Sequence, residues 1–143
     1  MLVRQIMKSP VIRVGPTTPA REIARLLLAH RISGAPVVDD DGRVIGMVSD
    51  GDLLSEHLPG REARRDWWLG VLAGGQTISA EYVKHMEDAS GAARHIMSHP
   101  PTVVAEDDDI RAVAALFDER RIKRAPVLRG ERLVGMVTRA DLL

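Results

Sequence analysis

Two stretches of the chain carry apolar residues at the spacing of an amphipathic helix, which packs one face on a core. The stretches are residues 18–31 and 108–121. The apolar positions are Ile23, Leu26 and Leu27 in the first, and Ile110, Val113, Ala114 and Phe117 in the second. The pattern therefore predicts two helices of similar length, one in each half of the chain.

Short runs rich in β-branched and apolar residues surround both predicted helices and indicate strands. The runs are 11–14, 36–38 and 44–49 in the first half, and 102–104, 126–128 and 133–138 in the second. Turns between the last two runs of each half carry Gly with charged residues, and Asp52 begins a further helix in the first half. Each half is predicted to fold as strand, helix, strand, strand, helix, and the chain belongs to the α/β (α+β) class.

The two halves are copies of one another. When residues 6–40 are aligned with 96–130, and 43–54 with 132–143, about 19 of 47 positions are identical. We therefore expect one repeat over residues 1–57 and a second over residues 92–143. The final helix of the second repeat has only begun at residue 143, so we expect the chain to be part of a longer protein.

Residues 58–91 have no counterpart in the second repeat and are predicted to form a helical insert. Residues 61–73 and 79–86 are the expected helices, because Gly74 and Gly75 interrupt the pattern between them. The insert either packs on the repeats as a linker or offers a partner or dimer surface through Trp67 and Trp68.

The composition excludes several classes of protein. The 143 residues include 20 Lys and Arg against 20 Asp and Glu, and this neutral balance argues against nucleic-acid binding. The absence of Cys removes disulfides, thiolate metal sites and a cysteine nucleophile. No apolar run approaches the length of a membrane span, and the sequence opens with no signal segment. These features predict a cytoplasmic protein that contacts neither membrane nor nucleic acid.

The repeats resemble a tandem pair of cystathionine-β-synthase (CBS) domains, also called a Bateman module. Both copies carry Ile-Met near their start and Arg-Ile-x-x-Ala-Pro-Val before the third run. They close on Gly-Met-Val-Ser-Asp-Gly-Asp-Leu-Leu at 46–54 and Gly-Met-Val-Thr-Arg-Ala-Asp-Leu-Leu at 135–143. The insert is similar to the connector of a subset of bacterial CBS-domain-containing proteins, in which a further C-terminal domain often follows.

This resemblance implies two β-α-β-β-α repeats packed as a pseudo-twofold pair, with the helical insert between them. It implies a regulatory module, without catalysis or a required cofactor, that binds an adenosine-containing ligand in the cleft between the repeats. The ligands of such modules are AMP, ADP, ATP, S-adenosylmethionine and NAD-type molecules. It also implies a homodimer that signals, by a change of conformation or dimer geometry, to a fused or separate effector domain.

The closing motif has a chemical logic of its own. Ser49 and Thr138 stand at a strand-to-helix junction, where a hydroxyl and unpaired helix amides can hold a phosphate. Asp52 and Asp141, three residues later, can accept hydrogen bonds from both hydroxyls of a ribose. The same spacing is also that of a helix capping box, and the two roles can coexist.

By the resemblance, the base lies in an apolar slot of one repeat and the ribose carboxylate comes from the other. The first candidate site consists of Val11, Ile12, Ile32, Ser33, Pro36, Thr138, Arg139 and Asp141. The second candidate site consists of Thr102, Ile122, Lys123, Pro126, Ser49 and Asp52.

The two candidate sites differ in charge. Arg139 lies within the motif of the first site, whereas Asp50 holds the matching position in the second and would repel a polyphosphate. Arg121, Lys123 and Arg124 could compensate for this carboxylate. We expect the Thr138/Asp141 site to bind phosphate better; the alternative is that these arginines only solvate helix ends.

Other functions are less consistent with the sequence. His95 and His99 lie four residues apart, but Pro100 follows and no third metal ligand lies at useful spacing. Neither a nucleophile with its base nor a metal cluster is recognisable, so we predict no catalysis and no metal. The rival to the nucleotide sensor is a ligand-independent module for dimerisation or protein interaction.

Overall fold

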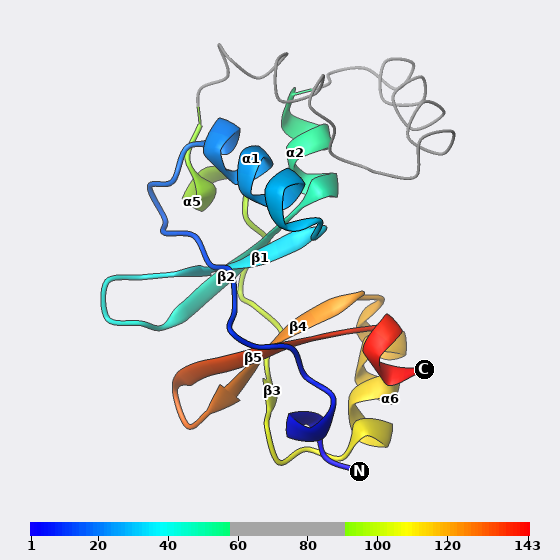
Figure 1. Ribbon diagram of the computed structural model, residues 1–143. Coiled ribbons are helices and arrows are strands. Elements are labelled where there is room, and N and C mark those ends of the chain that lie inside the picture. The colour runs from blue at the N-terminus through cyan, green and yellow to red at the C-terminus, as the bar shows by residue number, and fades with distance from the viewer. Residues whose placement is uncertain (58–90) are drawn as a thin grey trace.

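The computed structural model describes residues 1–57 and 91–143, which form two similar halves, each with a small sheet and its helices (Figure 1). The helical elements are η1 (Val3–Gln5), α1 (Ala20–His30), α2 (Asp50–His57), α5 (Ala93–Ile96), α6 (Ile110–Arg120) and η2 (Ala140–Leu142). The strands are β1 (Gly34–Val38), β2 (Val44–Ser49), β3 (Val104–Ala105), β4 (Arg124–Arg129) and β5 (Arg132–Thr138). The predicted insert helices, with Trp67 and Trp68, lie outside the described residues.

The helices α1 and α6 confirm the two amphipathic stretches and end in the same way. Their last turns are followed by Arg31 and Arg121, both in the left-handed conformation, with φ of 53° and 54°. The Asp109 side chain accepts a hydrogen bond of 2.8 Å from the amide of Arg111 and so caps the start of α6. No helix in the described parts of the chain is long and apolar enough to span a membrane.

The strands form one antiparallel pair in each half, β1 with β2 and β4 with β5. In the second half β3 adds a short parallel pairing to β4. The strand predicted at residues 11–14 is reduced to a single bridge between Val14 and Val37. The difference has a local cause, because the amide of Glu106 donates to Leu128 in the second half while Pro16, at the matching position, has no N–H.

Each half encloses its own apolar core, to which the other sequence repeat contributes. The first core contains Ile23 and Leu27 of α1 together with Ala93 of α5, all at most 1% exposed. The second core contains Phe117 of α6 together with Val3 of η1, again at most 1% exposed. Burial of apolar surface therefore joins the start of each sequence repeat to the other half.

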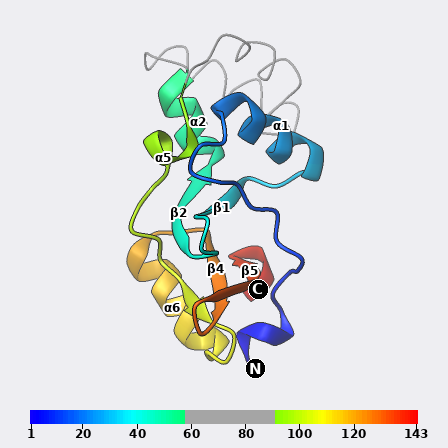
Figure 2. The ribbon, with the colours of Figure 1, turned by 90° about the vertical axis from the view of Figure 1, so that its left-hand side faces the viewer.

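Matching backbone hydrogen bonds hold the two exchanged segments, residues 1–8 and 91–98. Val3 donates to Asp108, and Ala93 donates to Thr18 at the equivalent position of the first half. Figure 1 shows η1 beside α6 and α5 beside α1 and α2, and Figure 2 shows the same exchange from another side. The pseudo-twofold pair is thus interlocked, and the boundaries of the two cores differ from those of the sequence repeats.

Candidate functional site

The end of β5 holds the carboxylate of Asp141 in a defined position. Its Oδ2 accepts hydrogen bonds from the amide and the hydroxyl of Thr138, at 2.9 and 3.0 Å. Its Oδ1 lies 3.6 Å from Nζ of Lys8, which the exchanged segment brings from the other sequence repeat. The Asp141 side chain is 10% exposed. One of its oxygens stabilises the turn after β5, and the other faces the exchanged segment of residues 1–8.

The end of β2 repeats this geometry around Asp52. Its Oδ2 accepts from the amide and the hydroxyl of Ser49, at 2.8 and 3.1 Å. Its Oδ1 is 3.5 Å from the hydroxyl of Ser98, which holds the position of Lys8 in the other exchanged segment. Both copies of the motif therefore contain the capping arrangement, and both direct the second carboxylate oxygen toward an exchanged segment.

In each half, a backbone hydrogen bond joins the closing motif to the residue directly before β1 or β4. The amide of Asp50 donates to the carbonyl of Ser33 at 2.8 Å, and the amide of Arg139 donates to the carbonyl of Lys123 at the same distance. The guanidinium of Arg139 also reaches the carbonyl of Ile122, at 3.4 Å. These bonds join Ile122 and Lys123 to Arg139, although the sequence interpretation assigned them to different candidate sites.

The side chain of Arg124 crosses from β4 to the first half. Its Nη2 donates to the hydroxyl of Ser33 at 2.5 Å, and its Cδ lies 2.7 Å from the point that a Cβ on Gly34 would occupy. Burial lowers the pKa of the Arg124 guanidinium below its ordinary value, and the nearby charges of Asp50 and Asp52 oppose this shift. The guanidinium thus contacts Ser33 of the first half and lies within the electrostatic influence of its acidic motif, and its side chain occupies the space beside Gly34.

The remaining members of the candidate sites include buried and partly buried residues, of which Ile32 and Ile122 pack against the two cores. Pro36 and Pro126 are buried within β1 and β4, where they pair with Met47 and Met136. Partial burial is shared by Val11, Ile12, Ile32, Thr102 and Ile122. The exchanged segments lead from Lys8 and Ser98, at the two carboxylates, directly into the chain that carries Val11, Ile12 and Thr102.

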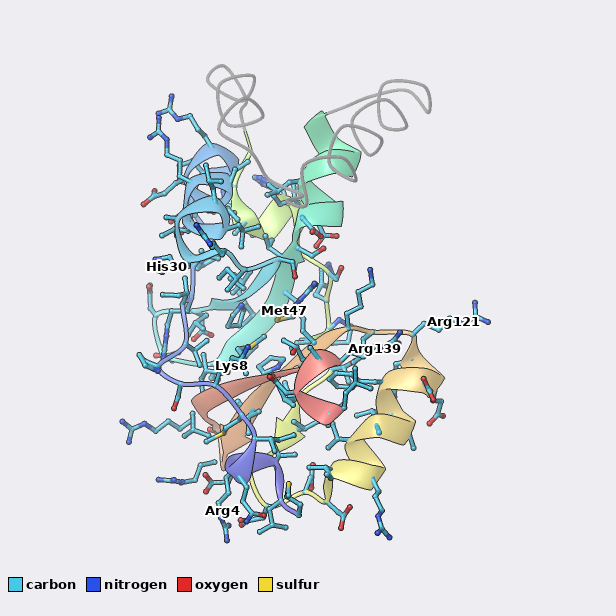
Figure 3. The ribbon with its side chains drawn as sticks, turned by 45° about the vertical axis from the view of Figure 1, so that its right-hand side comes forward. Arg4, Lys8, His30, Met47, Arg121 and Arg139 are labelled. Atoms are coloured by element: carbon cyan, nitrogen blue, oxygen red, sulfur yellow. The ribbon has the colours of Figure 1, made fainter. Side chains whose placement is uncertain are left out.

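Two contacts were missed by the sequence interpretation, because Lys8 and Ser98 occupy neither motif. The feature of the sequence that could have indicated them is their equivalent position, directly after Ile-Met in each repeat. Conversely, the sequence interpretation considered Arg121 as a charge that could compensate for Asp50, but its side chain extends away from the molecule (Figure 3). Among residues 1–57 and 91–143, no three His, Cys, Asp or Glu side chains are grouped to hold a metal ion.

Comparison with known proteins identifies the repeats. The CBS domain family model matches residues 3–58 and 93–143. Uncharacterized protein MJ1426 of Methanocaldococcus jannaschii is 30% identical, over the whole of this chain and 89% of its own length.

Solved structures show the same fold. The CBS domain of a CBS domain containing membrane protein from Sphaerobacter thermophilus is 29% identical, with a TM-score of 0.74 over 99% of this chain and 85% of that chain. CBSX2 of Arabidopsis thaliana, solved in complex with AMP, is 25% identical, with a TM-score of 0.69 over 99% and 92%. Because the family model covers both repeats, this chain belongs to the CBS-domain family and carries a CBS-domain pair.

Proposed function

We propose that this chain is a regulatory module that binds an adenosine-containing ligand at the junction of its two halves. The ligand class comprises AMP, ADP, ATP, S-adenosylmethionine and NAD-type molecules, and the module itself performs no catalysis. The similarity to CBSX2, which was solved with AMP, supports this class.

One observation carries the proposal: two equivalent carboxylates, each with one oxygen held by its own motif and the other directed toward an exchanged segment. A carboxylate held in this way is oriented before the ligand arrives, so binding loses little side-chain entropy. The Oδ1 atoms of Asp52 and Asp141 are the proposed acceptors for ribose hydroxyls. A ligand there would touch groups from both sequence repeats.

Contact with both repeats supplies a route to regulation. A ligand shifts a conformational equilibrium only as far as it binds one arrangement better than another. A molecule that bridges β5 or β2 and an exchanged segment favours the arrangement in which both surfaces face it. We propose that a homodimer and a fused or separate effector domain read this shift.

The test is calorimetric titration of the chain with AMP, ADP, ATP, S-adenosylmethionine and NAD. It is repeated on Asp141→Asn and Asp52→Asn, which keep an oxygen for the local cap but lose the charge. A matched control is Asp40→Asn, in the exposed turn between β1 and β2. Removal of one charged hydrogen-bond partner, worth about 1.5–3 kcal/mol, should weaken binding on the order of 10- to 100-fold.

The outcomes separate this proposal from its rival. Micromolar binding that one Asp→Asn variant loses and the Asp40→Asn control retains supports the nucleotide sensor. Absence of binding across the whole panel overturns it. A dimer that then persists in both variants, measured by sedimentation, would favour the ligand-independent interaction module.

A further inference from the structure

The two motifs share their backbone geometry and differ in charge. Asp50 and Arg139 follow Ser49 and Thr138, and each donates its amide to the start of the preceding strand at 2.8 Å. Their side chains therefore leave the backbone at equivalent points of the two halves. One half carries a carboxylate there and the other half a guanidinium.

A second pair of equivalent positions adds to this difference. Lys8 lies 3.6 Å from Oδ1 of Asp141, while Ser98 lies 3.5 Å from Oδ1 of Asp52. The carboxylate oxygen proposed to bind ribose thus has a cation beside it in one half and a neutral hydroxyl in the other. Figure 3 shows Lys8 and Arg139 at the level of η2, where the two halves meet.

The strand starts differ in the same direction. The carbonyl of Lys123, an exposed residue directly before β4, accepts a hydrogen bond from the amide of Arg139, while the carbonyl of neutral Ser33 accepts one from the amide of Asp50. Among residues 1–57 and 91–143, Arg124 is the cation whose charge interacts with Asp50 and Asp52, and its guanidinium already donates to the hydroxyl of Ser33. Within this described part of the chain, two carboxylates therefore lie near one guanidinium.

The Asp141 half has the opposite balance. Its motif carboxylate has Nζ of Lys8 3.6 Å from Oδ1, and the guanidinium of Arg139, two residues before Asp141, reaches the carbonyl of Ile122 at 3.4 Å. Gly34 holds the place of Arg124 and brings no charge across from β1. Because a phosphate is attracted by the one arrangement and repelled by the other, the two halves present different chemistry to one adenosyl scaffold.

We propose that the pair sorts adenosyl ligands by charge, an inference that rests on the proposed function. The site at Lys8, Arg139 and Asp141 takes a phosphorylated adenosine. The site at Asp50 and Asp52 takes an adenosyl ligand without phosphate, neutral or cationic, such as one with a sulfonium centre. The module would then report two different metabolite classes at once.

The experiment exchanges the equivalent charges. Arg139→Asp and Asp50→Arg are titrated by calorimetry with AMP, adenosine and S-adenosylmethionine, beside the unmodified chain. Asp141→Asn and Asp52→Asn assign each binding event to its half. Arg139→Gln repeats the test without a new charge, and circular dichroism verifies the fold of every variant.

The expected results are specific to each half. The unmodified chain binds one equivalent of AMP, which Asp141→Asn removes, and S-adenosylmethionine binding is lost in Asp52→Asn. Arg139→Asp weakens AMP at least tenfold and changes adenosine less than threefold, and Asp50→Arg creates a second AMP site.

Other results would overturn the inference. Charge sorting is wrong if two AMP molecules bind with similar affinity and each Asp→Asn variant removes one of them. It is also wrong if Arg139→Asp and Arg139→Gln leave the affinity for AMP unchanged; in both cases the proposed function survives. If no adenosyl ligand binds any protein in the series, the proposed function fails as well.

Discussion

Replacing Gly46 by alanine places a methyl group where an exchanged segment crosses β2. A Cβ at this position would lie 2.5 Å from Sδ of Met97 and 3.0 Å from the carbonyl oxygen of Ser98. The Met97 side chain can turn away, but the carbonyl cannot retreat freely. Ser98 is held by two backbone hydrogen bonds to Met47, of 2.8 and 3.0 Å.

Two opposing effects determine the size of the loss. Added volume at a packed contact costs about 1–3 kcal/mol. Alanine also restricts the unfolded chain more than glycine does, which returns about 0.5–1 kcal/mol. The net expectation for Gly46→Ala is a decrease of about 0–2.5 kcal/mol in the free energy of unfolding, centred near about 1 kcal/mol.

Urea denaturation measures this decrease, with Gly15→Ala as the matched control. A Cβ at Gly15 meets only the hydroxyl of Thr18, at 3.7 Å, so no clash opposes the gain through the unfolded chain, and we expect the stability to be unchanged or raised by up to about 1 kcal/mol. A double-mutant cycle with Met97→Ala then tests the contact itself, because relief of the clash makes the combined loss smaller than the sum. Equal stability of Gly46→Ala and Gly15→Ala, together with additive losses in the cycle, would refute the exchanged packing.

Three further predictions concern the second half. Phe117→Ala, at a side chain 1% exposed in the second core, should lower the free energy of unfolding by about 3–5 kcal/mol in thermal or urea melts. Asp109→Ala removes the cap of α6 and should cost about 0.5–2 kcal/mol, whereas Asp109→Asn should retain most of it. The hydrogen bonds from Arg129 lower the pKa of Glu106, so their stabilising contribution is present above the unfolded pKa and is lost as pH falls through the folded one. The stability difference between the unmodified chain and Glu106→Gln should therefore shrink in acid, and a difference independent of pH would contradict this ion pair.

Much of the fold follows from local pattern. Apolar spacing placed α1 and α6 within about two residues at their ends, and the short β-branched and apolar runs located β1, β2, β4 and β5. The repeat also indicated that both halves share one architecture, which the CBS-domain structures confirm. The strand predicted at residues 11–14 is reduced to a single bridge because Pro16 lacks the amide that, at the equivalent Glu106, completes the pairing in the second half.

Part of the candidate site was also within reach of the sequence. The spacing of Ser49 with Asp52, and of Thr138 with Asp141, predicts a hydroxyl and a carboxylate in contact, because three residues span one turn. The contact of Lys8 with Asp141 and that of Arg124 with Ser33 depend on which segments meet after folding. Neither contact has a local spacing that could indicate it.

The exchange of the segments around Val3 and Ala93 shows most clearly which features the sequence determines and which the tertiary structure decides. These segments are equivalent in the repeat and both are apolar, so the local pattern is compatible with packing on either half. The sequence determines that each segment must bury its apolar side chains. Which core receives them is decided only in the tertiary structure, where the path of the chain between the halves and the hydrogen bonds to Asp108 and Thr18 select one arrangement.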